Sequence, residues 1–158
     1  MTSMAEMRKF QEDYLRAEEE LRRLDGEMLA LEEQYIRENG IVNADDGSIP
    51  DSILNIHDEN AFMEADARCS EIADAAGLLA KLRQASGTLH AAEDALIRGT
   101  VELLPDRFHK EKETLMAAAR NNIKIRGKLI SRGMSLDTGL EEEMAAAQEI
   151  ADVTGLGL

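Results

Sequence analysis

Residues 7–35 read MRKFQEDYLRAEEELRRLDGEMLALEEQY and contain the pattern that decides the fold. Apolar residues recur there at alternating spacings of three and four, the period at which one stripe of an α-helix meets a neighbouring helix. Charged residues flank this stripe, as on helix surfaces that face water. The pattern predicts an unbroken heptad seam of nine positions: Met7, Phe10, Tyr14, Ala17, Leu21, Leu24, Met28, Leu31 and Tyr35.

Local signals place the ends of this helix near residues 3 and 39. Ser3 and Glu6 have the spacing of a capping box, in which each side chain accepts a hydrogen bond from a free backbone amide of the first turn. Asn39 and Gly40 favour the left-handed conformation that ends many helices. The sequence therefore predicts a long coiled-coil helix within residues 1–40.

The next two segments are predicted to be a loop and a second long helical stretch. Residues 41–57 contain Asn43, Asp45-Asp46-Gly47 and Pro50, which are turn formers. Asp58 is a suitable N-cap, and Pro105 forbids continuation, so a helix is expected over residues 58–104. The apolar period slips near Ser86-Gly87, which leaves open one kinked helix or two helices with the break there.

The C-terminal part is predicted to hold a basic helix and a short final helix. The basic helix is expected over residues 106–132, with Gly133 ending it. Thr138 and Glu141 form a second capping box for the short helix. The fold class is all-α, with three to four principal helices: residues 1–40 form the coiled-coil helix, 41–57 a loop, and 58–158 a helical hairpin or bundle.

The heptad seam requires a partner helix, and the pattern allows two. The first is another chain, which would make the protein a homodimer or another homo-oligomer. The second is the helical stretch 58–104 of the same chain, in an intrachain hairpin. Nine positions in register exceed what a bundle helix requires, which favours the other chain. The residues predicted to self-associate are Met7, Phe10, Tyr14, Leu21, Leu24, Met28, Leu31 and Tyr35.

Composition limits the classes of partner. Aromatic residues make up 3% of the chain and charged residues 32%, a profile typical of long helices. The net charge of −14 disfavours binding to nucleic acid or to anionic membranes. Neither a secretory signal nor an apolar run long enough to span a membrane is recognisable, so we expect a cytoplasmic protein, or a virion protein if a phage encodes it.

The charge is distributed unevenly along the chain. Residues 106–132 hold eight basic and three acidic residues, whereas the rest holds ten basic and twenty-nine acidic residues. One interpretation is that this basic segment lies against acidic helices of its own chain or a partner chain. The other is that it binds an acidic surface, for which the predicted contact residues, at spacings of about four, are Arg120, Lys124, Lys128 and Arg132.

The sequence nominates no catalytic, cofactor or metal site. Asp45-Asp46-Gly47 lacks the ligand spacing of a calcium loop, because Val42 and Ile53 would occupy ligand positions, and a polar turn is expected instead. His57, His90 and His109 form no pattern typical of a di-iron bundle. Cys69 lies on an apolar stripe among acidic neighbours, so it is expected to pack as a small apolar residue.

Two stretches resemble the polarity suppression proteins of satellite phages. They are Ala30-Leu-Glu-Glu-Gln-Tyr-Ile-Arg-Glu-Asn-Gly40 and Ala117-Ala-Ala-Arg-Asn-Asn-Ile-Lys-Ile-Arg126, and the spacing between them is also similar. The resemblance implies an intertwined helical homodimer that binds the transcription terminator Rho, suppresses termination and decorates the capsid exterior. No contact residue is carried over from the family.

The expected function is therefore non-enzymatic protein–protein interaction by a homodimer, with Rho or a capsid protein as the partner. The alternatives are a viral scaffolding or capsid-assembly protein unrelated to Rho, and a generic coiled-coil adaptor.

Overall fold

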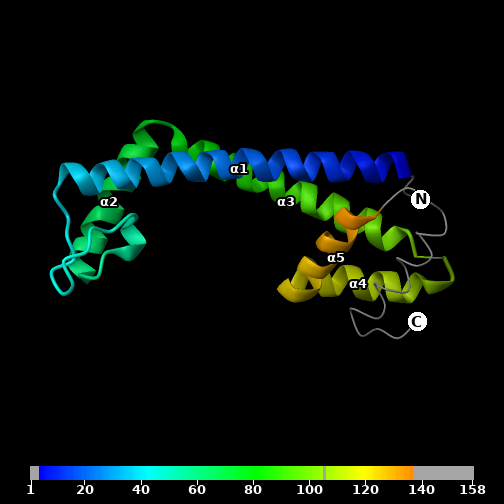
Figure 1. Cartoon of the computed structure of the whole chain (residues 1–158). Helices are drawn as coiled ribbons and strands as arrows, with labels where there is room; N and C mark the ends of the chain where they lie inside the picture. Colours follow the sequence, from blue (N-terminus) through cyan, green and yellow to red (C-terminus); the bar gives the residue numbers. More distant parts are fainter. Residues whose placement is uncertain (1–3, 105, 137–158) are drawn as a thin grey trace. The chain divides into compact units, whose positions relative to one another are not determined.

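The computed structural model describes residues 4–104 and 106–136, and this part of the chain is helical and contains no strand. Two short 3-10 turns, Ile53–Asn55 and Asp106–Phe108, lie between helices. The predicted all-α fold is confirmed (Figure 1). Within the described residues, the five α-helices are α1 (Met4–Glu38), α2 (Glu59–Ala75), α3 (Leu78–Glu102), α4 (His109–Asn121) and α5 (Ile123–Ser135).

The chain divides into two compact units. One unit contains residues 1–17 and 88–158, and the other contains residues 18–87. Helices α1 and α3 each contribute one part to each unit. We call these the terminal unit and the central unit, and describe each by itself.

The long N-terminal helix is confirmed over Met4–Glu38. Ser3 of the predicted capping box lies outside the described residues. At the other end, Gly40 has a φ of +59°, and the amides of Gly40 and Ile41 donate hydrogen bonds to the carbonyls of Arg37 and Ile36. This pair of bonds satisfies two of the last free carbonyls of α1, as in a Schellman motif.

The helical stretch 58–104 is two helices, but the predicted break at Ser86-Gly87 is wrong. Helix α2 ends before Gly77, which has a φ of +76°, and the amide of Gly77 donates to the carbonyl of Asp74. Gly87 stays inside α3, where a Cβ on it would meet nothing within 4 Å. The slip of the apolar period therefore leaves the helix intact, and the chain turns at the glycine that adopts a left-handed conformation.

The basic segment is also two helices, which corrects the predicted single helix over 106–132. Asn122 has φ −132° and ψ 110°, outside the helical region, and separates α4 from α5. Its amide donates to the carbonyl of Ala118, and its side chain accepts from the amides of Lys124 and Ile125. Asn122 thus ends one helix and caps the next. Helix α5 continues past Gly133 to Ser135, and the helix predicted from Thr138 lies outside the described residues.

Each unit has its own apolar core. In the terminal unit, α3, the segment that follows it, α4 and α5 bury six residues against one another: Ile97, Val101, Leu104, Leu115, Ala119 and Leu129. A neighbouring cluster joins Met7 of α1 to Leu96 and Leu136. In the central unit, the two clusters are Leu24, Ala73, Leu78 and Ala85, and Ile53, Ile56, Ala65 and Cys69.

Among the described residues, the helices are either too short or insufficiently apolar to cross a membrane.

Candidate protein-binding surface

The heptad seam of α1 is covered by residues of its own chain. In the terminal unit, Met7 is fully buried in a cluster with Leu96 and Leu136, and Phe10 and Tyr14 pack against it. In the central unit, Leu21, Leu24, Met28, Leu31 and Tyr35 pack in clusters formed with α2, the start of α3 and the 3-10 turn Ile53–Asn55. The structure therefore shows the packing of the intrachain alternative, and self-association through these residues stays a prediction.

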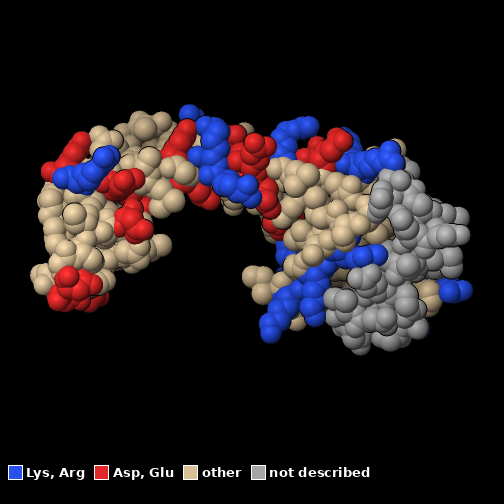
Figure 2. Space-filling model, viewed as in Figure 1, with Lys and Arg blue, Asp and Glu red and all other residues tan. Residues whose placement is uncertain are grey.

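The four predicted partner-binding residues lie on two helices. Lys124, Lys128 and Arg132 follow one another at four-residue spacing on α5, whereas Arg120 lies on α4. The break at Asn122 interrupts the single row that a continuous helix would have formed. Arg120, Lys124 and Lys128 are exposed, and Arg132 is half-buried. Lys and Arg side chains gather over α4 and α5 in Figure 2.

Arg126 forms hydrogen bonds with acidic residues of its own unit. Its guanidinium donates to Glu93 Oε2 at 2.9 Å and to Asp94 Oδ1 at 2.8 Å, both on α3. Burial disfavours the charged guanidinium, but the hydrogen bonds with Asp94 and Glu93 outweigh this effect and raise the pKa of Arg126. For this residue the basic segment does lie against acidic groups of the same chain, as the first interpretation of the charge pattern expects.

The junction of α4 and α5 presents cations that have no partner among the described residues. Neither Arg120 nor the Lys124 ammonium forms a hydrogen bond or ion pair with any residue that the structure describes. Ile123, between them in sequence, is 84% exposed. We call Arg120, Ile123 and Lys124 the junction surface. It combines positive charge with an apolar side chain that the fold leaves uncovered.

A groove lies between α3 and α4 in the same unit. It consists of two hollows of about 410 and 320 Å³ that share Arg98, Met116 and Arg120 in their linings. Arg98 projects from α3, is exposed, and has no hydrogen bond or ion pair with a described residue. Sequence reasoning missed Arg98, because it lies outside the basic segment and only the packing of α3 on α4 brings it beside Arg120.

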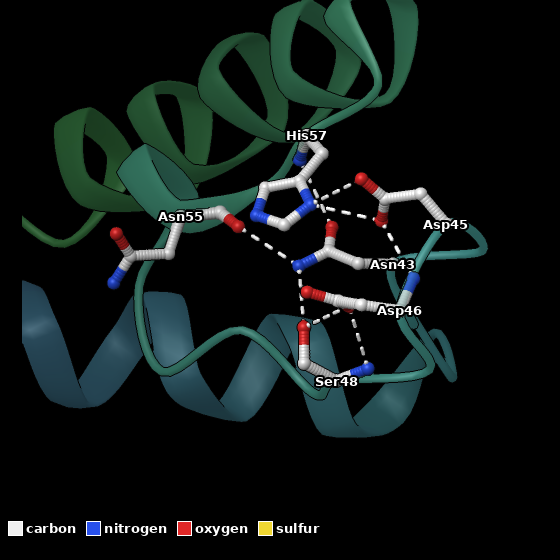
Figure 3. Close-up of polar contacts among 6 residues, drawn as sticks. All are labelled: Asn43, Asp45, Asp46, Ser48, Asn55 and His57. Carbon is white, nitrogen blue, oxygen red and sulfur yellow. Dashed lines mark hydrogen bonds and ion pairs between the residues drawn. The ribbon is translucent and has the colours of Figure 1, made fainter.

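A second polar site lies in the loop before α2 (Figure 3). The side chain of Asn43, 4% exposed, donates to Ser48 Oγ and to the carbonyl of Asn55, and accepts from the amide of His57. The backbone of Asn43 also bonds with Ser48 and Gly47. Asn43 therefore holds the two ends of the loop together, a role that turn propensity alone could not reveal.

Asp45, Asp46 and His57 are the described residues that could hold a metal ion. One potential ligand atom from each lies within 4.8 Å of the others, and all three side chains are exposed. Asp46 accepts from the amide and hydroxyl of Ser48, and His57 Nδ1 lies 2.9 Å from Asp45 Oδ1. The hydrogen bond with Asp45 raises the pKa of His57. These bonds account for the cluster as the polar turn that the sequence predicts.

Cys69 lacks the surroundings of a nucleophile. It is buried on α2, and burial, followed by the charges of Glu32 and Asp66, raises the pKa of its thiol. A raised pKa reduces the thiolate fraction, which is the reactive form. The structure thus places Cys69 in the core, as the apolar stripe indicated.

These observations leave the junction surface and the adjoining groove as the strongest candidates for contact with another molecule. The chain matches no protein-family model, no curated protein and no solved structure with which it was compared.

Proposed function

We propose that this protein is a non-enzymatic homodimer that binds an acidic surface of another protein through α4 and α5. The observation that carries the proposal is the junction surface. Arg120 and Lys124 have no partner among the described residues, and Ile123 is exposed between them. Cationic side chains can pair with the carboxylates of an acidic protein, and an apolar side chain between them can be buried in the contact.

A nucleic-acid partner is less well supported. The net charge of −14 opposes the approach of a phosphate backbone. Bases also need exposed aromatic faces for stacking. The aromatic residue of this region, Phe108, is half-buried, with the Arg107 guanidinium 4.7 Å from its ring centroid. An acidic protein surface fits both the cations and Ile123.

The resemblance to polarity suppression proteins nominates Rho and a phage capsid as partners. The alternatives are a scaffolding role unrelated to Rho and a generic adaptor. Within the homodimer, the seam of α1 is already packed against its own chain, so the dimer would form either by exchange of helices between chains or through other surfaces.

The test measures binding of the full chain to purified Rho and to purified capsids in parallel. We expect Arg120→Glu with Lys124→Glu to weaken capture by about tenfold or more, because two attractive contacts become repulsive. Arg83→Glu, an exposed change on α3 in the central unit, is the control and should bind as the wild type does. If the chain binds neither Rho nor capsids, both are excluded as partners. If the double variant binds as tightly as the wild type, the junction surface is not the contact surface.

The homodimer is tested by sedimentation velocity of the wild-type chain. A mass near twice 17.4 kDa is expected, and a monomer at all concentrations would contradict it.

A further inference from the structure

We propose that the groove between α3 and α4 receives an acidic peptide segment of the partner protein, with Arg98 and Arg120 binding its carboxylates. This inference rests on the proposed function, which makes the partner a protein with an acidic surface. It adds a second contact region and a residue, Arg98, that lies outside the basic segment.

The groove lies between two helices that share an apolar cluster. Ile97 and Val101 of α3 are buried against Leu115 and Ala119 of α4. Arg98 from α3 and Arg120 from α4 each follow one of these buried residues in sequence and line both hollows. The groove is therefore lined by one arginine from each of the two helices.

The other Lys and Arg residues that line the groove already form ion pairs within the chain. Lys112 forms an ion pair of 3.3 Å with Asp106, and Arg126 is held by Glu93 and Asp94. Arg98 and Arg120 form no such bond with the described part of the chain. Each guanidinium retains donors in a planar fork that matches a carboxylate.

The remaining lining favours a peptide carboxylate over a chain of phosphates. Val101, Met116 and Ala117 offer apolar contact for the methylene groups of a Glu side chain. Glu102 and Glu113 line the same hollow, and their charges would repel a chain of phosphates, which has no apolar stem to offset the repulsion, more than they repel Glu side chains. Charge complementarity and apolar contact together identify the occupant as an acidic peptide.

The test titrates the full chain against a fluorescein-labelled hexaglutamate peptide, followed by fluorescence anisotropy. We expect saturable, salt-sensitive binding by the wild type. Arg98→Gln and Arg120→Gln should each raise Kd by about tenfold, while Arg83→Gln, the same change on α3 outside the groove, should leave Kd unchanged. Far-UV circular dichroism of each variant checks that the helices remain folded.

Three outcomes of the peptide-binding measurements would overturn the proposal. The first is unchanged affinity in both Arg98→Gln and Arg120→Gln. The second is tighter binding of a polyphosphate of equal charge than of hexaglutamate. The third concerns residues 137–158 of the chain itself, which contain six acidic residues and no Lys or Arg. If Glu141→Gln, Glu142→Gln and Glu143→Gln together strengthen peptide binding, the chain's own C-terminal segment is the occupant.

The assay also separates this inference from the proposed function. Peptide binding that depends on Arg98, without binding to Rho or capsids, supports the groove and contradicts those partners. Binding to Rho or capsids that depends on Arg120 and Lys124 but not on Arg98 supports the proposed function and contradicts the groove.

Discussion

The side-chain amide of Gln11 in α1 donates a hydrogen bond of 2.7 Å to the carbonyl oxygen of Gly133 in α5. The same nitrogen lies 3.0 Å from the carbonyl oxygen of Leu136. Because α5 ends at Ser135, the carbonyl of Gly133 belongs to its last turn, where no following helical amide can reach it, and the carbonyl of Leu136 belongs to the residue directly after the helix. Gln11 therefore satisfies carbonyl groups at the end of α5, although it lies more than a hundred positions away from them in sequence.

Gly133→Ala should destabilise the terminal unit. Gly133 is buried, and an added Cβ would collide with Thr100 Oγ1 and lie 3.0 Å from Leu96 Cγ. Thr100 cannot move freely, since its hydroxyl donates to the carbonyl of Leu96 at 2.7 Å. Overpacking of this kind costs about 1–3 kcal/mol. Urea denaturation followed by circular dichroism measures the loss.

Gly127→Ala is the matched control, on the same helix. A Cβ there would meet nothing within 4 Å, and the residue is exposed. The free energy of unfolding should rise by up to about 1 kcal/mol, because Ala favours a helix more than Gly does. Equal effects of the two substitutions would show that α5 does not pack on α3 as described.

Arg126→Met should lower stability by about 1–3 kcal/mol, because it leaves two carboxylates without their cation. The side chains of Arg126 and Glu93 are 16% and 21% exposed, so water compensates only in part. Arg68→Met is the control, since its ion pair with Glu71 is 3.7 Å long and well exposed. That change should cost less than about 0.5 kcal/mol. A similar loss for both variants in thermal denaturation would contradict a stabilising role of the Arg126 cluster.

The helices could be predicted from the sequence better than the points at which they break. The heptad period and Gly40 located α1 correctly, because both signals are local. Ser86-Gly87 and Gly77 offer similar local chemistry, yet only Gly77 adopts a positive φ. In the sequence, Asn122 is not distinguished from other residues of a helix. In the structure, where α5 packs against α4, it caps α5. Local propensity was therefore not enough to place either break, because structural context routinely overrides it.

The candidate site, too, could be predicted from the sequence only in part. A charge count along the chain found Arg120 and Lys124, since clustering in sequence is visible without a structure. The count also included Arg126, whose charge is paired with Glu93 in the folded chain. It missed Arg98, which joins the lining of the groove only when α3 packs on α4. Which cations remain available depends on contacts between helices that no local pattern contains.

Asn43→Ala should destabilise the loop of the central unit. The substitution removes three hydrogen bonds and leaves the partners Asn55 carbonyl and His57 amide unsatisfied in a partly buried site. The expected cost is about 2–3 kcal/mol. Hydrogen exchange should show faster exchange over residues 41–57, while α5 exchanges as in the wild type. Asn121→Ala, an exposed change at the end of α4, is the control and should leave the loop unaffected.

Glu32→Gln should stabilise the central unit, and the gain should depend on pH. Glu32 is 8% exposed, and burial, followed by the charge of Asp66, raises its pKa. The folded chain therefore holds this proton more tightly than the unfolded chain, whose Glu pKa is about 4.3. Stability falls as pH rises from that value through the folded pKa, and the loss persists above it. Gln cannot ionise, so the variant should exceed the wild type in urea midpoint at about pH 8 and match it near pH 4. Glu33→Gln, an exposed neighbour on α1, should show no such trend. A difference independent of pH would show that Glu32 is ionised at no cost in the folded chain.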